Sequence, residues 1–136
     1  MRAILTLLLL ICWPAALPAL SLDCTALQAC VTAMGDCQET EVRYRLDAED
    51  KVGAKVVLTT DEQEKSYEFR RLAHAEGLRL QAAGGALEPQ QGAGALTIFD
   101  DLSFVLTRHQ MLFFDGEGQP GSAVAITILG QCEDRE

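Results

Sequence analysis

The chain has 136 residues, 49% of them hydrophobic, and its 11 lysines and arginines against 20 aspartates and glutamates give a net charge of −9 at pH 7. A chain of this length forms one domain and can bury a sizeable core. The acidic balance argues against a nucleic-acid-binding role, which needs a basic surface for the phosphates, and it disfavours binding to anionic membrane surfaces.

Residues 1–21 have the layout of a secretory signal peptide. Arg2 is followed by an apolar run over 3–12, and two prolines and several small residues come next. The apolar run is about half as long as the roughly 20 residues that a membrane-spanning helix needs. We therefore predict cleavage after Ser21, or alternatively after Ala19, and an exported protein, periplasmic or secreted, with no membrane span in the mature chain.

The cysteine count indicates structural disulfides. One of the five cysteines belongs to the predicted signal peptide, so an even number remains in an oxidising compartment. Their spacing fits neither a zinc site, which has two close pairs, nor a C-x-x-C redox motif. The sequence thus predicts disulfides, no metal site and no cofactor. The cysteines concerned are Cys24, Cys30, Cys37 and Cys132.

The segment after the predicted cleavage sites is expected to form a short N-terminal helix over 25–34. Leu27 and Met34 recur at helical spacing, Asp23 is a suitable N-cap, and Gly35 is a suitable C-terminal residue.

This helix restricts the disulfide pairing. It separates Cys24 from both Cys30 and Cys37 by more than a disulfide can bridge, because a helix rises about 1.5 Å per residue. The remaining arrangement pairs Cys30 with Cys37 and Cys24 with Cys132. The second bond would hold the N-terminus beside the last strand.

The rest of the chain shows strand patterns. Residues 41–47 alternate apolar and charged side chains without exception, which is typical of a half-buried strand. Further strands are predicted over 54–60, 67–70, 78–80, 96–98, 102–107, 111–114 and 123–129. We predict a single mainly β domain over 22–136, either an antiparallel meander or a small barrel-like sheet, with the N-terminal helix covering one face.

The segment 82–95, "AAGGALEPQQGAGA", interrupts this pattern with small residues, glycines and a proline. Such a composition predicts a loop between two strands. Long loops on a rigid sheet often carry recognition residues, so we predict a recognition loop here, with a simple connector as the alternative. Its candidate contact residues are Leu87, Glu88, Gln90 and Gln91.

Residues suited to catalysis are few. His74 and His109 are the only histidines, and no G-x-S-x-G motif is present. The adjacent carboxylates Asp100 and Asp101 would point to opposite faces of a strand, and EF-hand spacing is missing. The sequence predicts that the protein is not an enzyme and has no catalytic, cofactor-binding or metal-binding residues.

The order of a signal peptide, four cysteines, antiparallel strands and a terminal Gly-x-Cys strand ending at Cys132 resembles small exported bacterial four-cysteine β-meander proteins of unassigned function. In architecture it is also similar to the small disulfide-stapled periplasmic inhibitors of lysozyme. We predict a non-catalytic exported envelope or periplasmic protein with a binding or structural role. The alternative, an acidic inhibitor of a cationic hydrolase, is favoured by the net charge and the second resemblance. The partner is expected to be a protein or small ligand, cationic in the alternative case.

Overall fold

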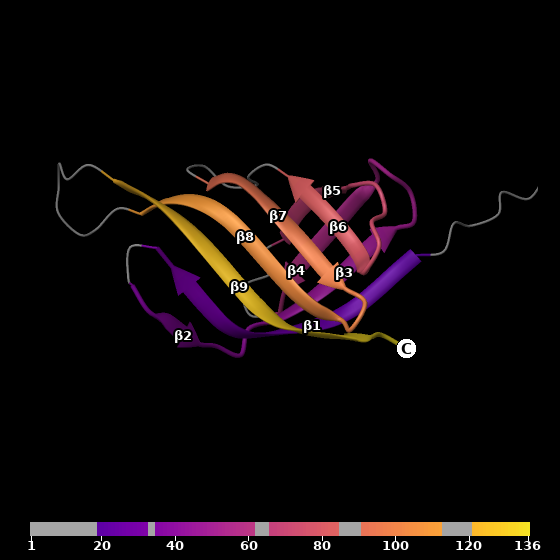
Figure 1. Cartoon of the computed structure of the whole chain (residues 1–136), viewed down its shortest axis with the longest axis horizontal. Coiled ribbons are helices and arrows are strands. Elements are labelled where there is room, and N and C mark those ends of the chain that lie inside the picture. The colour runs from indigo at the N-terminus through magenta and orange to yellow at the C-terminus, as the bar shows by residue number, and fades with distance from the viewer. Residues whose placement is uncertain (1–18, 33–34, 62–65, 85–90, 113–120) are drawn as a thin grey trace, which may run out of the picture.

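The computed structural model describes residues 19–32, 35–61, 66–84, 91–112 and 121–136, and these residues form nine β-strands (Figure 1). The strands are β1 (Ala19–Val31), β2 (Cys37–Glu39), β3 (Arg43–Glu49), β4 (Lys55–Thr60), β5 (Ser66–Arg71), β6 (Leu78–Gly84), β7 (Gln91–Phe99), β8 (Ser103–Leu112) and β9 (Ser122–Asp134). All neighbouring strands are antiparallel, in the order β2-β1-β3-β4-β5-β6-β7-β8-β9. Within these ranges no helix is long and apolar enough to cross a membrane.

The sheet closes on itself because β9 also pairs with β1, which makes an antiparallel barrel of eight strands, β1 and β3–β9. The first half of β1 pairs with β3, and its second half lies between β9 and the short β2. Only β2 stands outside the barrel. The prediction of a mainly β fold is confirmed, and a closed barrel takes the place of the open meander.

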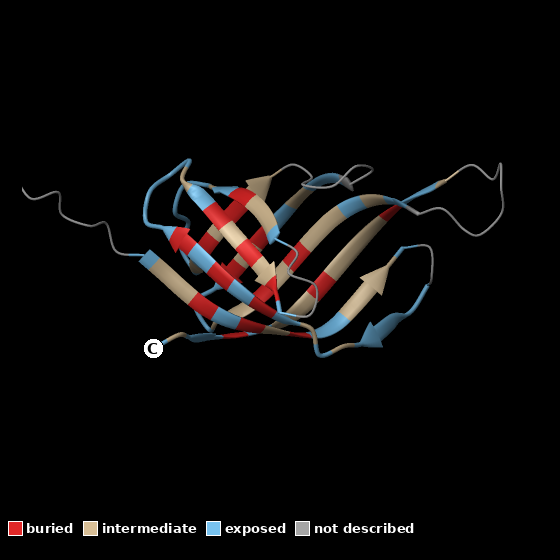
Figure 2. Ribbon diagram, turned by 180° about the vertical axis from the view of Figure 1, so that it is seen from behind, coloured by how far each residue is buried: buried red, intermediate tan, exposed pale blue. Residues whose placement is uncertain are grey.

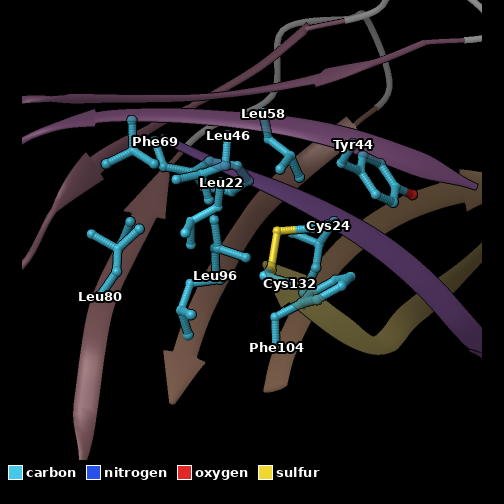
Figure 3. Close-up of a cluster of buried hydrophobic side chains, with 14 of the residues drawn as sticks. Leu22, Cys24, Tyr44, Leu46, Leu58, Phe69, Leu80, Leu96, Phe104 and Cys132 are labelled. Carbon is cyan, nitrogen blue, oxygen red and sulfur yellow. A yellow bond between two sulfur atoms is a disulfide. The ribbon is translucent and has the colours of Figure 1, made fainter. Parts of the chain in front are cut away.

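The barrel forms because alternate residues of each strand are apolar. In β3, Tyr44, Leu46 and Ala48 are buried, while the charged residues between them are exposed. Figure 2 shows the resulting bands of buried and exposed positions along the strands, and Figure 3 shows buried side chains of several strands meeting in one cluster. The largest fully buried side chains are Phe104, Leu22, Leu46, Leu58, Leu80, Leu96, Ile98, Leu106 and Val56.

The predicted N-terminal helix is wrong, because its first residues belong to β1. Leu22, Cys24 and Ala26 are buried at every second position, as in a strand. The pairing with β9 then shifts register between Ala26 and Gln28, and the extra residue, Leu27, is 55% exposed. A β-bulge of this kind breaks the period of two. After it, the inward phase passes from even to odd positions, and Ala29 packs against the core, so no single period of two runs through the segment.

The two disulfides join Cys24 to Cys132 and Cys30 to Cys37. Each bond links residues that lie directly opposite one another on paired strands, with Cα–Cα distances of 3.9 Å and 4.1 Å. The first bond is buried inside the barrel, and the second fastens the protruding β1–β2 hairpin. These are the pairs that the helical argument selected, but the cause is strand register rather than helix length.

β1 begins at Ala19, within the segment predicted to be the signal peptide. The hydroxyl of Ser21 donates a hydrogen bond of 2.8 Å to Asp47, and the Ser21 carbonyl accepts one of 3.1 Å from the backbone N–H of Arg135. Cleavage after Ala19, the alternative site, keeps both contacts in the mature chain. The rest of the predicted leader, residues 1–18, lies outside the described residues.

The predicted loop over 82–95 is strand at both of its ends. Ala82 to Gly84 complete β6, and the residues from Gln91 onward begin β7. A Cβ atom on Gly84 would lie 2.5 Å from the backbone oxygen of Glu68, so β5 approaches β6 too closely there for any side chain. Close strand packing therefore explains this glycine. Leu87, Glu88 and Gln90, and the side chain of Gln91, lie outside the described residues.

Replacing both Cys24 and Cys132 with alanine should lower the free energy of unfolding by about 4–5 kcal/mol, because this bond joins residues 108 apart and long loops lose most entropy on closure. The matched control removes Cys30 and Cys37, which are 7 apart and for which the same model gives about 2 kcal/mol. Urea denaturation measures both. Equal losses in the two double variants would contradict the assignment of the buried disulfide as the main staple.

Candidate functional site

Two polar side chains meet inside the barrel although their strands are not neighbours. Tyr67 lies on β5 and Arg108 on β8, with β6 and β7 between them in the sheet. Nη1 of Arg108 donates a hydrogen bond of 2.7 Å to the hydroxyl oxygen of Tyr67, and Cζ of Arg108 lies 5.1 Å from the centre of the Tyr67 ring. A contact between strands so far apart in a closed sheet has to cross the barrel interior.

The strand alternation places Arg108 on this inner face. Phe104 and Leu106 of β8 are 1% and 2% exposed, and Arg108 is the next residue in the same phase. Arg108 is half-buried, and its Nε atom is inaccessible to water and has no hydrogen-bond partner. An arginine therefore takes a position that the pattern of the strand would give to an apolar residue.

Tyr44 of β3 completes a group that we call the Arg108 cluster, formed by Tyr44, Tyr67 and Arg108. The Tyr44 ring packs edge-on against Phe104, with 6.3 Å between ring centres, and its hydroxyl points away from the aliphatic side chains (Figure 3). Burial raises the pKa of Tyr44 above its ordinary value of 10.0; the nearby Tyr67 raises it further, and the charge of Arg108 partly opposes both effects.

Glycines on the adjacent strands leave room for the Arg108 side chain. Gly94 of β7 lies directly opposite Arg108, and Gly84 of β6 lies opposite Gly94. Residues paired in this way project to the same face of the sheet, so the inner wall between Arg108 and β5 has two positions without side chains. A Cβ atom on Gly94 would lie 3.3 Å from Cβ of Arg108 and 2.6 Å from the backbone oxygen of Thr107.

The cluster lies toward the barrel end at which β6 ends and β7 begins. Gln91 pairs with Gln110, which is two residues beyond Arg108 on β8. The predicted recognition segment connects Gly84 to Gln91, and both of these residues lie at this end. The segment's own contact residues lie outside the described ranges, so the structure does not place them against the cluster.

The residues considered for catalysis lie apart from the cluster. His74 and His109 are both exposed. The carboxylate of Asp101 accepts hydrogen bonds from the backbone and hydroxyl of Ser103, which lower its pKa and give it a role in the β7–β8 turn. In the part of the chain that the structure describes, no three His, Cys, Asp or Glu residues gather as metal ligands would.

Two depressions on the outer surface are the other candidate sites. One, of about 270 Å³, has charges of both signs; it is lined by Asp23, Cys24, Thr25, Arg43, Tyr44, Arg45, Asp61 and Glu133. The other, of about 560 Å³, lies beside the β1–β2 hairpin and is lined by Leu27, Glu39, Thr40 and Glu41. Both are open to solvent, and within the described ranges no polar atom of either is both buried and unpartnered.

No family model, curated protein or solved structure matches the chain. Geometry and chemistry alone therefore support the choice of the Arg108 cluster. Sequence reasoning missed this cluster, although one signal for it was present. The alternation Phe104, Leu106, Arg108 puts a cation in the inward phase of a strand.

Alkaline pH should destabilise the protein through Tyr44. The pKa of Tyr44 is raised in the folded state, so the contribution of this residue is complete below the unfolded value of 10.0 and is lost as the pH rises through the higher folded value. Urea denaturation between about pH 9 and pH 11 should show the free energy of unfolding falling less steeply in Tyr44→Phe than in the unmodified chain. Identical pH profiles would contradict the raised pKa.

Proposed function

We propose that this chain is an exported, non-catalytic binding protein that receives its ligand at the barrel end of the Arg108 cluster. The observation that carries the proposal is the hydrogen-bond donor Nε of Arg108, which lies inside the barrel and has no acceptor among the described residues. Buried donors without partners are costly and uncommon in proteins. A site that waits for an incoming acceptor accounts for this one.

The packing of the barrel supports a ligand site at this end rather than one in the interior as a whole. Below the cluster, the interior is occupied by side chains such as Leu22, Leu46 and Leu96, each 0% exposed. Small barrels are commonly filled in this way, and ligands then bind at their mouths. A ligand would therefore contact the Arg108 end without entering the packed core.

The disulfides support export. Both bonds need an oxidising compartment to form and persist. One joins β1 to β9, the two strands at the barrel seam, and the other joins β1 to β2. A stapled barrel with a filled core suits a rigid binding module.

A nuclear magnetic resonance titration tests this function. Aliphatic carboxylates, sugar phosphates, neutral sugars, aliphatic alcohols and lysozyme are added separately to the isotope-labelled protein. At least one small molecule should shift the amide signals of Tyr67, Arg108 and Ile126 and leave those of Gly53 and Gly77, in turns remote from the cluster, unchanged. Absence of any small-molecule binding at the cluster would overturn the proposal.

The same titration tests the second candidate, an acidic inhibitor of a cationic hydrolase. The observation that favours it is the depression beside the hairpin, where Glu39 and Glu41 flank the exposed Leu27. Lysozyme should then broaden the signals of these hairpin residues, and added salt should abolish the effect, because exposed charges are screened. Lysozyme binding confined to the hairpin, without small-molecule binding at the cluster, would favour the inhibitor.

A further inference from the structure

One edge of the Arg108 guanidinium has no hydrogen-bond partner among the described residues. Nη1 donates to Tyr67, whereas Nε has no partner. In a planar guanidinium, the N–H of Nε and one N–H of Nη2 point in parallel from the same edge, and this edge matches the two oxygens of a carboxylate. The contact with Tyr67 thus leaves this edge without a partner among the described residues. Because Nε is inaccessible to water, the side chain has to shift to admit a ligand oxygen there.

The charge of Arg108 also has no partner in the part of the chain that the structure describes. Arg71, Arg79 and Arg135 each form an ion pair with an aspartate on the outer surface, with N–O distances of 2.8–3.2 Å. Within the described ranges no carboxylate pairs with Arg108, although acidic residues outnumber basic ones in the chain. An anion from outside would supply the missing counter-charge.

Tyr67 offers a further donor to the same anion. Its hydroxyl oxygen accepts the hydrogen bond from Arg108, so the hydroxyl's own proton is directed elsewhere. An oxyanion beside the guanidinium can accept that proton's hydrogen bond as well. The two side chains together thus offer hydrogen-bond donors to the ligand, which suits a ligand group that only accepts hydrogen bonds.

The neighbours of Arg108 indicate the shape of the ligand. On β9, Ile126 lies directly opposite Arg108, and Val124, which is 5% exposed, lies opposite Gln110. On β7, the opposite residue is Gly94, which has no side chain. The guanidinium therefore has an apolar wall on one side and a wall of bare backbone on the other.

We propose that the Arg108 cluster binds a small monocarboxylate with an apolar body, which deepens and rests on the proposed binding function. The guanidinium edge and the Tyr67 hydroxyl receive the carboxylate, and the wall formed by Ile126 and Val124 receives the apolar body. A single cation matches a single negative charge. The net charge of −9 disfavours phosphates and other polyanions, which would need more cations than the cluster has.

The test compares hexanoate with hexanol and hexanamide, which have similar bodies and no charge, by isothermal titration calorimetry on the full chain. Hexanoate should bind more tightly than either neutral compound. Arg108→Met, which keeps the volume but removes the donors, should weaken hexanoate binding roughly 10- to 100-fold, the usual effect of losing a charge-assisted hydrogen bond, and leave the neutral compounds unchanged. Arg108→Lys, which keeps the charge but loses the bidentate edge, should give a smaller loss.

The matched control is Arg70→Gln, which removes an exposed arginine from the outer face of β5 and should leave hexanoate binding unchanged. Thermal unfolding shows whether each variant is folded. If Arg108→Met does not fold, hexanoate binding to Arg108→Lys decides the test. Equal binding of hexanoate and hexanol, or hexanoate binding that neither Arg108 variant weakens, would overturn the inference. The proposed function would survive that result if a neutral compound shifted the cluster's signals, and it would fail only if none of the small molecules bound there.

Discussion

The pairing of β1 with β9 is the interaction on which the rest of the structure depends. It converts a row of antiparallel strands into a barrel, and the buried Cys24–Cys132 bond fixes it at directly opposite residues. Without this seam, the apolar faces of β8 and β9 would have no cover, and β1 would be an open edge liable to pair with other chains. The remaining barrel strands are joined along the chain and need no such long-range closure.

Closure also creates the candidate site. Arg108 and Tyr67 lie on strands separated by two others, and they meet only because the sheet curves until its inner faces oppose each other. The glycines at 84 and 94 permit close strand contacts, and a side chain at 94 would crowd the arginine. Within the described ranges, this half-buried arginine is held by a phenol and not by a carboxylate. The proposed anion site rests on this arrangement.

Much of the fold follows from alternation that is visible in the sequence. The alternation over 41–47 is so regular that the strand observed at 43–49 and its buried face could be predicted. The first strand could not, because the bulge at Leu27 disguises its period. Closure was only partly visible, since the predicted Cys24–Cys132 bond placed the N-terminal segment beside the last strand, but as a helix rather than as a paired strand. The inward phase of Arg108 could be predicted, but its partner Tyr67 could not, because only the closed barrel brings β5 and β8 together.

A double-mutant cycle with Arg108→Met and Tyr67→Phe measures most directly whether the barrel closes around this contact. The free energy of unfolding is measured by urea denaturation for the unmodified chain, the two single variants and the double variant. A hydrogen bond between the two side chains predicts a coupling energy of about 1 kcal/mol. Effects that add to within about 0.3 kcal/mol would show that the side chains do not meet, and they would contradict both the cross-barrel contact and the site built on it.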